Sequence, residues 1–135
     1  IRTSWLYGPG GKNFVDTMVE LHRKNGGKPL KVVNDQRGCP TYSIDLANAV
    51  LGLLKAKEHG IFHVVNNGSC TWYEFAVEIF RQLGVNQPVD PITSKDLNRP
   101  AHRPKCSILL NTKLPRLRKW QEALEDYLSN KTLIL

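Results

Sequence analysis

A glycine-rich segment from Gly8 to Lys12 is the first place where this sequence could hold a phosphate group. It precedes a predicted helix, and the first backbone amides of a helix can bind an anion. A dinucleotide site needs the pattern Gly-x-Gly-x-x-Gly, and a phosphate loop needs Ser or Thr directly after its Lys. The segment matches neither pattern, because Asn13 follows Lys12. We therefore interpret it as a turn, and the chain carries no cofactor fingerprint of its own.

Tyr127 and Lys131 have the spacing of a proton-donating pair. Short-chain dehydrogenases place a Lys four positions after a Tyr, where its charge lowers the Tyr pKa. Tyr127, however, lies on an apolar helical stripe with Trp120 and Leu124, and the predicted helix ends within a turn. These observations favour a buried structural tyrosine. We expect no catalytic residue within the chain.

The histidines and cysteines do not form a recognisable catalytic or metal-binding motif. The four histidines share no ligand spacing, no Ser, His and Asp constellation is visible, and the cysteines never form a Cys-x-x-Cys pair. These residues are His22, His59, His63 and His102, and Cys39, Cys70 and Cys106. We predict no metal site and no disulfide framework, and the three thiols fit a reduced, cytoplasmic protein.

Basic residues give the chain a formal charge of +7 and gather in its last third. The cluster consists of Arg99, Arg103, Lys105, Lys113, Arg116, Arg118 and Lys119. No aromatic residue interleaves with it to stack bases, which favours a pocket for a small anion over a nucleic-acid surface. The longest apolar runs, such as Ala49 to Leu54, are far shorter than the roughly 20 residues that span a membrane. We expect neither nucleic-acid nor membrane partners.

The segments that would position the residues discussed above alternate between strand-like and helix-like patterns, and short connections rich in Gly and Pro join them. Strands are predicted over Ile1–Tyr7, Leu30–Val33 and Ile61–Val65, with a loop over Asn34–Thr41 and a largely irregular segment over Val85–Pro104 that has at most a short strand and one helical turn. Helices are predicted from Asn13 to about Asn25, over a segment containing Leu46–Leu54 that Gly60 ends, from Thr71 to Gly84, and from about Arg118. This order is typical of an α/β fold with parallel strands.

Three of these helices have clear apolar faces. The expected buried residues are Leu46, Ala49, Val50, Leu53 and Leu54 in one helix, Trp72, Phe75, Ala76, Ile79, Phe80 and Leu83 in the next, and Trp120, Ala123, Leu124, Tyr127 and Leu128 in the last. Thr71 and Glu74 form a capping box at the start of the third helix. With 135 residues, 41% of them hydrophobic, the chain suits one folded unit. Because it lacks an initiator Met and begins inside a strand-like run, we expect it to be part of a longer protein.

Polar residues beside the predicted strand ends make up five ordered segments, which together span the chain up to about Leu128. They are Arg2–Gly8 with Asn13 and Phe14, Asn34–Thr41, Asp45–Ala47, Thr71–Ala76 and Arg99–Leu109. In this order they resemble the back half of the dTDP-4-dehydrorhamnose reductases, which are extended short-chain dehydrogenases. The resemblance implies the last Rossmann strand plus a smaller, mixed α/β substrate-binding domain. Residues 1–135 would form this C-terminal sugar-nucleotide-binding portion, and the N-terminal NAD(P)-binding half would be absent.

The resemblance also implies roles for single residues. Thr3 and Ser4 would lie near the nicotinamide of NADPH or NADH, and Trp5 would flank the deoxyhexose ring of a dTDP-sugar. Arg103 would pair with the diphosphate. Asn13 and the loop that contains Gln36 would shape the sugar pocket, although Gln36 could equally brace its own loop. A buried strand residue is the alternative for Trp5, a solvated surface residue is the alternative for Arg103, and Trp72 and Phe75 are interpreted as core.

By the same resemblance, the full-length protein would reduce dTDP-4-dehydro-β-L-rhamnose to dTDP-β-L-rhamnose for bacterial surface polysaccharides. The Thr, Tyr and Lys of the catalytic set would lie upstream, so this chain alone would be inactive. Some family members hold a metal at a dimer contact with a Glu, and Ile44 stands at that place here. A homodimer linked by magnesium is therefore not expected, although another homodimer of the full-length protein remains open. A non-catalytic member of the superfamily and another sugar-nucleotide epimerase or dehydratase are the alternatives.

Overall fold

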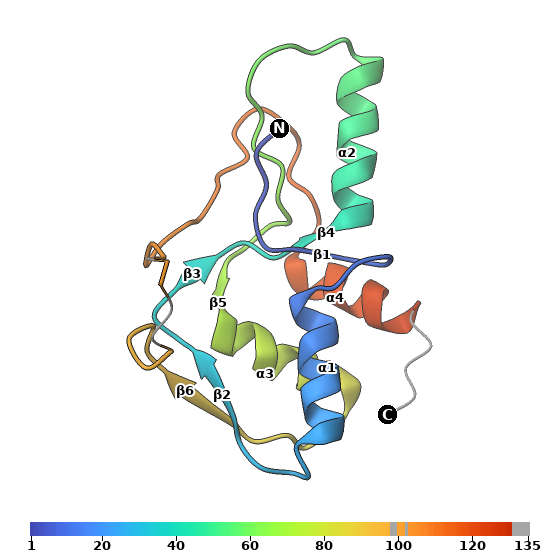
Figure 1. Ribbon diagram of the computed structural model, residues 1–135. Helices are drawn as coiled ribbons and strands as arrows, with labels where there is room; N and C mark the ends of the chain where they lie inside the picture. Colours follow the sequence, from blue (N-terminus) through green and yellow to red (C-terminus); the bar gives the residue numbers. More distant parts are fainter. Residues whose placement is uncertain (98–99, 102, 131–135) are drawn as a thin grey trace.

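The computed structural model describes residues 1–97, 100–101 and 103–130, and places four helices and six short strands among them. The helices are α1 (Phe14–Lys24), α2 (Ser43–Lys55), α3 (Trp72–Leu83) and α4 (Trp120–Ser129). The strands are β1 (Leu6–Tyr7), β2 (Leu30–Val33), β3 (Arg37–Gly38), β4 (Thr41–Tyr42), β5 (Cys70–Thr71) and β6 (Val89–Ile92). Helices α1, α3 and α4 pack in one lobe, and α2 stands apart from them (Figure 1).

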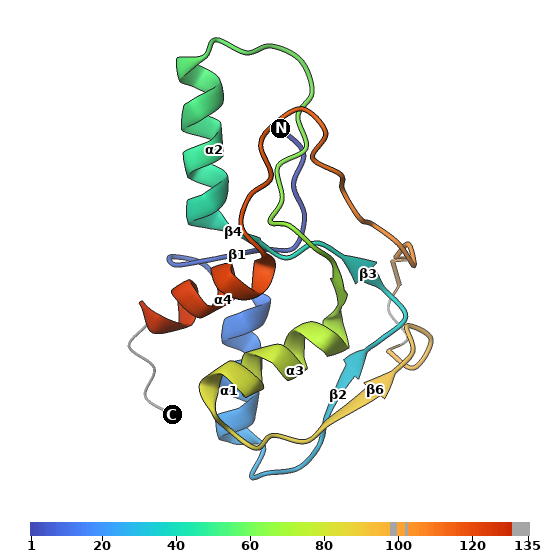
Figure 2. The same cartoon turned by 180° about the vertical axis from the view of Figure 1, so that it is seen from behind.

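The strands pair in three small sheets. β1 pairs with β4 in parallel, with Leu6 opposite Thr41, and β3 pairs with β5 antiparallel. β2 and β6 form the longest ladder, in which Leu30–Val33 run parallel to Val89–Ile92 along the edge of the α1–α3 lobe (Figure 2). The mixed α/β architecture confirms the predicted fold class.

Helices α1 and α3 start where the sequence predicts, because each has a polar cap. The Asn13 side chain accepts a hydrogen bond from the Asp16 amide at the start of α1. Thr71 and Glu74 form a complete capping box at α3, and Gly84 ends that helix with a φ of 67°, a left-handed conformation that suits glycine. The caps therefore fix both elements independently of the packing behind them.

The main core lies between α1, α3, α4 and the β2 strand. Its fully buried members include Val15, Phe75, Ile79 and Leu124. The expected stripe of α4 is buried in full, and that of α3 is buried except for the half-buried Trp72 and Leu83. Aromatic rings add directional contacts, since Phe75 lies within 5.6 Å of the ring centroids of Tyr7, Phe14 and Trp120.

Helix α2 has a much smaller buried face than its sequence predicts. Leu53 packs with Phe62 and Val64 in a second cluster, with Leu46 and Ala49 partly buried against it. Leu54 is 68% exposed, so its expected place on the buried face is wrong. Among the described residues, apolar neighbours cover only the side of α2 that carries Leu46, Ala49 and Leu53, while Leu51 and Leu54 remain exposed.

Two strand predictions, one loop prediction and one helix boundary need correction. The run Ile1–Tyr7 is broken because Trp5 adopts a φ of 46°, so only Leu6 and Tyr7 form a strand and Arg2 makes a single parallel bridge to His63. The strand predicted over Ile61–Val65 is likewise reduced to this one bridge at His63. The two segments do not pair further, because the chain turns away at Trp5.

The predicted loop Asn34–Thr41 contains β3 and the first residue of β4, because Arg37 and Gly38 find partners on β5. The last helix begins at Trp120 rather than at about Arg118, whose side chain is engaged in ion pairs before the helix starts. Three residues of the predicted motifs, Arg99, His102 and Lys131, lie outside the described residues.

Candidate functional site

A cavity of about 850 Å³ lies between α1, β2 and the segments that follow β6, within the size range of small-molecule sites. Its apolar wall comes from helix α1, β2 and the start of α3. The lining residues used below are Phe14, Met18, Leu21, Lys31, Val32, Asp35, Gln36, Trp72, Ser94, Lys95, Leu97, Arg103 and Lys105. The cavity therefore combines one apolar wall with a polar opposite side.

Four cations line the polar part of this cavity: Lys31, Lys95, Arg103 and Lys105. Among the described residues, none of the four has a carboxylate within 4.0 Å. Asp35 is the one acid among the lining residues. The excess of positive charge beside an apolar wall suits a ligand with a ring at one end and phosphate groups at the other.

Ser94 fixes the loop after β2 to the turn after β6. Its amide and hydroxyl donate to the Asp35 carboxylate at 2.6–3.0 Å, and the Gln36 amide donates to the Ser94 hydroxyl at 2.7 Å. These hydrogen bonds from Ser94 lower the pKa of Asp35 below its usual value, so the carboxylate stays ionised as an acceptor. Gln36 thus braces the loop and lines the cavity at once, which joins the two roles that the sequence left open.

Trp72, which lines the cavity, stacks closely on Trp5, which does not line it. Their ring centroids are 3.6 Å apart and the ring planes differ by 11°. Phe14 also contacts Trp72, and the centroids of these two rings are 4.6 Å apart. Trp5 is itself half-buried, so it is neither a fully enclosed strand residue nor a free surface side chain. Phe75 is core as predicted, whereas Trp72 is half-buried and lines the cavity.

Gly38 makes room for the Trp5 ring. A Cβ atom at Gly38 would lie 2.4 Å from Cε2 of Trp5, which no real contact tolerates. The positive φ of Trp5 is uncommon for a bulky residue and costs conformational energy. The slot over Gly38 and the stack on Trp72 together hold the indole in this conformation.

The other residues singled out by the sequence, Thr3, Ser4 and Asn13, do not line the cavity. Thr3 is exposed, and the Ser4 hydroxyl donates to the Cys39 carbonyl at 2.9 Å. Asn13 does not line the cavity; its amide donates to the Gly8 carbonyl at 3.0 Å and it caps α1. The structure thus brings Gln36 and Arg103 together at one cavity, with Trp5 joined to it through Trp72.

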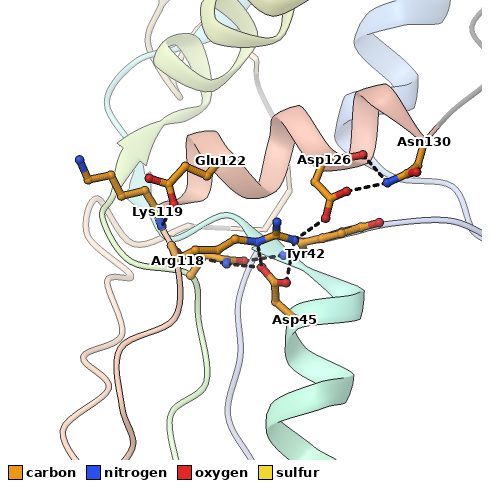
Figure 3. A network of polar contacts seen from close by, with 8 residues as sticks. Tyr42, Asp45, Arg118, Lys119, Glu122, Asp126 and Asn130 are labelled. Carbon is orange, nitrogen blue, oxygen red and sulfur yellow. Dashed lines mark hydrogen bonds and ion pairs between the residues drawn. The ribbon is translucent and has the colours of Figure 1, made fainter.

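Arg118 is the centre of a polar network that joins α2 to α4 (Figure 3). Its guanidinium donates to both oxygens of Asp45 at 2.8 Å and to Asp126 at 2.7 Å. The fully buried Asn66 donates to Asp45 at 2.6 Å and accepts from the Tyr42 amide. Hydrogen bonding to Asp45 raises the pKa of Arg118 further above its already high value. Arg118, which the sequence grouped with the basic cluster, is therefore a structural residue that holds α2 and α4 together.

Lys31 and Lys95 are cavity cations that the sequence pattern did not single out. Lys31 lies on β2, where it is exposed between the buried Leu30 and Val32. That alternation was the available signal. Lys95 lies in the turn that Ser94 ties to Asp35, a contact between residues 59 apart in sequence, so no local pattern could predict it.

The match to a known protein family extends over almost the whole chain. The family described as the RmlD substrate binding domain matches residues 1–133, and the chain belongs to this family. No helix among the described residues is long and apolar enough to cross a membrane.

Relatives of the chain are named for polysaccharide biosynthesis and for the reduction of a dTDP-sugar. A spore coat polysaccharide biosynthesis protein of Bacillus subtilis is 42% identical over 98% of this chain and 47% of its own length. A dTDP-4-dehydrorhamnose reductase of Streptomyces griseus is 42% identical over 93% of this chain and 44% of its length. The chain thus spans about half the length of the curated relatives it matches.

Solved structures agree with this match. A dTDP-4-dehydrorhamnose reductase of Clostridium acetobutylicum superposes with a TM-score of 0.89 at 46% identity, over 95% of this chain and 46% of that one. The Bacillus anthracis enzyme, solved in complex with NADP, gives a TM-score of 0.91 at 37% identity, over 96% of this chain and 47% of that one. The chain corresponds to about half of each.

Proposed function

We propose that the full-length protein reduces dTDP-4-dehydro-β-L-rhamnose to dTDP-β-L-rhamnose with NADPH or NADH, in the bacterial cytoplasm, and that this chain is its substrate-binding portion. The observation that carries the proposal is the cavity with an apolar wall and four cations, next to a rigid aromatic pair. Relatives and solved structures named dTDP-4-dehydrorhamnose reductase support it.

The cavity sorts the parts of such a substrate by their chemistry. The thymine ring would lie on the apolar wall formed by Met18 and Leu21, and the diphosphate would face Arg103, whose planar fork pairs with phosphate oxygens. The deoxyhexose would then extend toward Trp5. This arrangement holds both ends of the substrate and presents the hexose carbonyl in one orientation, which is the entropic share of catalysis.

The nicotinamide cofactor finds little to bind in this chain. Thr3 is exposed and could face a nicotinamide edge, whereas the Ser4 hydroxyl already donates to Cys39. The bound cofactor would supply a hydride to C4 of the hexose, and the proton would come from a Tyr upstream of Ile1. The residues present bind and orient the sugar nucleotide, so the chain alone is expected to lack reductase activity.

Two alternatives make different demands on the same cavity. Another sugar-nucleotide epimerase or dehydratase would bind the same kind of ligand and transform a different sugar. A non-catalytic member of the superfamily would bind a sugar nucleotide without turnover. Neither is favoured by a residue of this chain, so the reductase remains the proposal.

The test is a reductase assay of the full-length protein with dTDP-4-dehydrorhamnose and either cofactor. Arg103→Ala should raise the KM for the sugar nucleotide about tenfold or more, because it removes a charge-assisted pair to the diphosphate. Lys113→Ala is the matched control, since Lys113 is basic but does not line the cavity and should leave KM unchanged. Absence of turnover by the wild-type protein, or equal kinetics of the two variants, would contradict the proposal.

A further inference from the structure

The turn over residues 93–97, directly after β6, is mostly exposed and yet held by several hydrogen bonds. Asp96 closes it from within, because its carboxylate accepts from the amide and the hydroxyl of Thr93, each at 2.8 Å. The Asp96 amide donates in return to the Thr93 carbonyl at 3.1 Å. An Asp side chain that accepts from nearby backbone stabilises a turn locally. The turn is therefore a stiff unit, although it lies at the surface.

Ser94 joins this turn to the side of the cavity. Its amide donates to both oxygens of Asp35, at 2.9 and 3.0 Å, and its hydroxyl donates to the same carboxylate at 2.6 Å. That hydroxyl has one proton, and an ionised carboxylate can only accept. The contact with Gln36 at 2.7 Å must therefore run the other way, with the Gln36 amide as the donor. Ser94 thus binds two residues of the loop after β2, and both of them line the cavity.

The loop that holds Ser94 is itself fixed by neighbouring elements. β2 and β6 run in parallel up to Val33 and Ile92, and the Asn34 amide extends the ladder by donating to the Ile92 carbonyl at 2.9 Å (Figure 2). The Asn34 side chain accepts from the Thr71 hydroxyl at 2.7 Å, which ties the loop to the cap of α3. The hydrogen bonds of Ser94 therefore set the turn against a firm support.

Lys95 is the cation that this turn presents to the cavity, which it lines together with Arg103. The acids of the two joined segments, Asp35 and Asp96, accept hydrogen bonds from the turn itself. Among the described residues, no cation lies within 4.0 Å of either acid. The charge of Lys95 is thus left for a ligand. A fixed backbone helps such a lysine to bind, because only its side chain must then lose conformational freedom.

We propose that Ser94 is a positioning residue, which holds the turn so that Lys95 binds the diphosphate of a sugar nucleotide together with Arg103. This inference rests on the proposed function and deepens it, since it adds a second phosphate ligand and the residue that places it. Lys95 supplies a compact charge beside the planar, bidentate guanidinium of Arg103. Ser94 acts through Lys95 and need not touch the ligand.

A cycle of single and combined substitutions in the full-length protein tests the link between the two residues. Lys95→Met should raise the Kd for dTDP about fivefold, because it removes one of the phosphate ligands. Ser94→Ala should raise this Kd about threefold, because the turn loses its side-chain bonds to Asp35 and Gln36. The combined variant should bind dTDP no more than about twofold more weakly than Lys95→Met alone, since the Ser94 hydroxyl matters only through Lys95.

Steady-state kinetics separate positioning from a general loss of the site. Both single variants should raise the KM for dTDP-4-dehydrorhamnose and keep kcat within about twofold of wild type, because the diphosphate is bound equally in the ground state and the transition state. Ser94→Thr keeps the hydroxyl and should restore the wild-type KM to within about twofold.

Ser107→Ala is the matched control for the loss of a serine hydroxyl. The Ser107 hydroxyl donates to the Arg37 carbonyl at 3.3 Å, joins segments 70 positions apart, and does not line the cavity. Its removal should leave the Kd for dTDP unchanged. Ser94 lies outside both apolar clusters, so Ser94→Ala should keep a cooperative thermal transition, which circular dichroism measures.

The inference is overturned if Lys95→Met keeps the wild-type Kd for dTDP, or if the effects of Lys95→Met and Ser94→Ala multiply in the combined variant. An equal loss of affinity in Ser94→Ala and Ser107→Ala would also contradict it. A wild-type protein whose dTDP affinity depends on Lys95 but which has no reductase activity would refute the proposed function instead.

Discussion

Helices α2 and α3 have similar apolar patterns in the sequence and very different surroundings in the structure. In α3, Phe75, Ala76, Ile79 and Phe80 are all buried, whereas Leu53 is the one buried residue of α2. Ile44, Leu51 and Leu54 of α2 are large apolar residues that remain exposed. Helical periodicity therefore identifies an apolar face, but it does not tell which element covers it.

The two helices are also anchored by different means. A capping box and an aromatic core hold α3, while α2 begins after Tyr42 without a side-chain cap and depends on ion pairs from Asp45 to Arg118. Hydrophobic burial is the larger and less salt-sensitive of these two sources of stability. Four substitutions test this difference.

Phe75→Ala should give the largest effect. The ring is fully buried and contacts three other aromatic side chains, so its removal should cost about 4 kcal/mol of unfolding free energy. Urea denaturation followed by circular dichroism measures this change. Val77→Ala, on the exposed side of the same helix, is the control, and a similar loss in both variants would contradict the assigned core.

Arg118→Met should destabilise the join between α2 and α4 by about 2 kcal/mol, because Asp45 and Asp126 lose their shared cation. Hydrogen exchange should rise first at the start of α2. Arg81→Met removes an exposed pair with Glu78 within one helix and should cost less than about 0.5 kcal/mol. If both variants lost equal stability, the network would have no special role in holding α2.

Thr71→Ala should cost about 1 kcal/mol, since it removes the oxygen that accepts from the Glu74 amide at the α3 cap. Thr71→Ser keeps that acceptor and should stay close to wild type. The comparison is made by thermal unfolding of the two variants. An equal loss in both would assign the effect to the methyl group of Thr71 rather than to the cap.

Leu54→Ser should have the smallest effect, below about 0.5 kcal/mol, because this side chain is already 68% exposed in the chain. Its neighbour Leu53 is buried with Phe62 and Val64, and Leu53→Ser should cost about 3 kcal/mol. Denaturation midpoints of the pair give a direct reading of how narrow the covered strip of α2 is. A large loss from Leu54→Ser would show that this strip is wider.

Local chemistry explains which parts of the fold the sequence predicts. Helix α1 is capped by Asn13 and α3 by Thr71, and β2 forms over its predicted residues, since caps and short apolar runs are local features. The broken first strand depends on Trp5 meeting Trp72, which is 67 positions away, and β3 exists because Arg37 lies opposite Thr71. Such long-range pairs leave no periodic trace.

The candidate site divides in the same way. Arg103 and Gln36 are found through a resemblance that spans ordered segments, and both line the cavity. Lys95 and the wall position of Trp72 follow from tertiary contacts, because the Ser94–Asp35 bonds and the Trp5 stack join distant segments. The helical stripe alone suggests that Trp72 is core. Only the tertiary structure shows that it is half-buried and lines the cavity.

Calorimetric titration of the full-length protein with dTDP, and with dTMP as the one-phosphate control, tests whether the cavity binds the diphosphate of a sugar nucleotide. We expect dTDP to bind with a Kd about tenfold lower than that of dTMP, and Arg103→Ala to remove most of this difference, because the second phosphate meets the cationic side of the cavity. Equal affinity for the two nucleotides, or an unchanged dTDP affinity in Arg103→Ala, would contradict the assignment of this cavity to a sugar nucleotide.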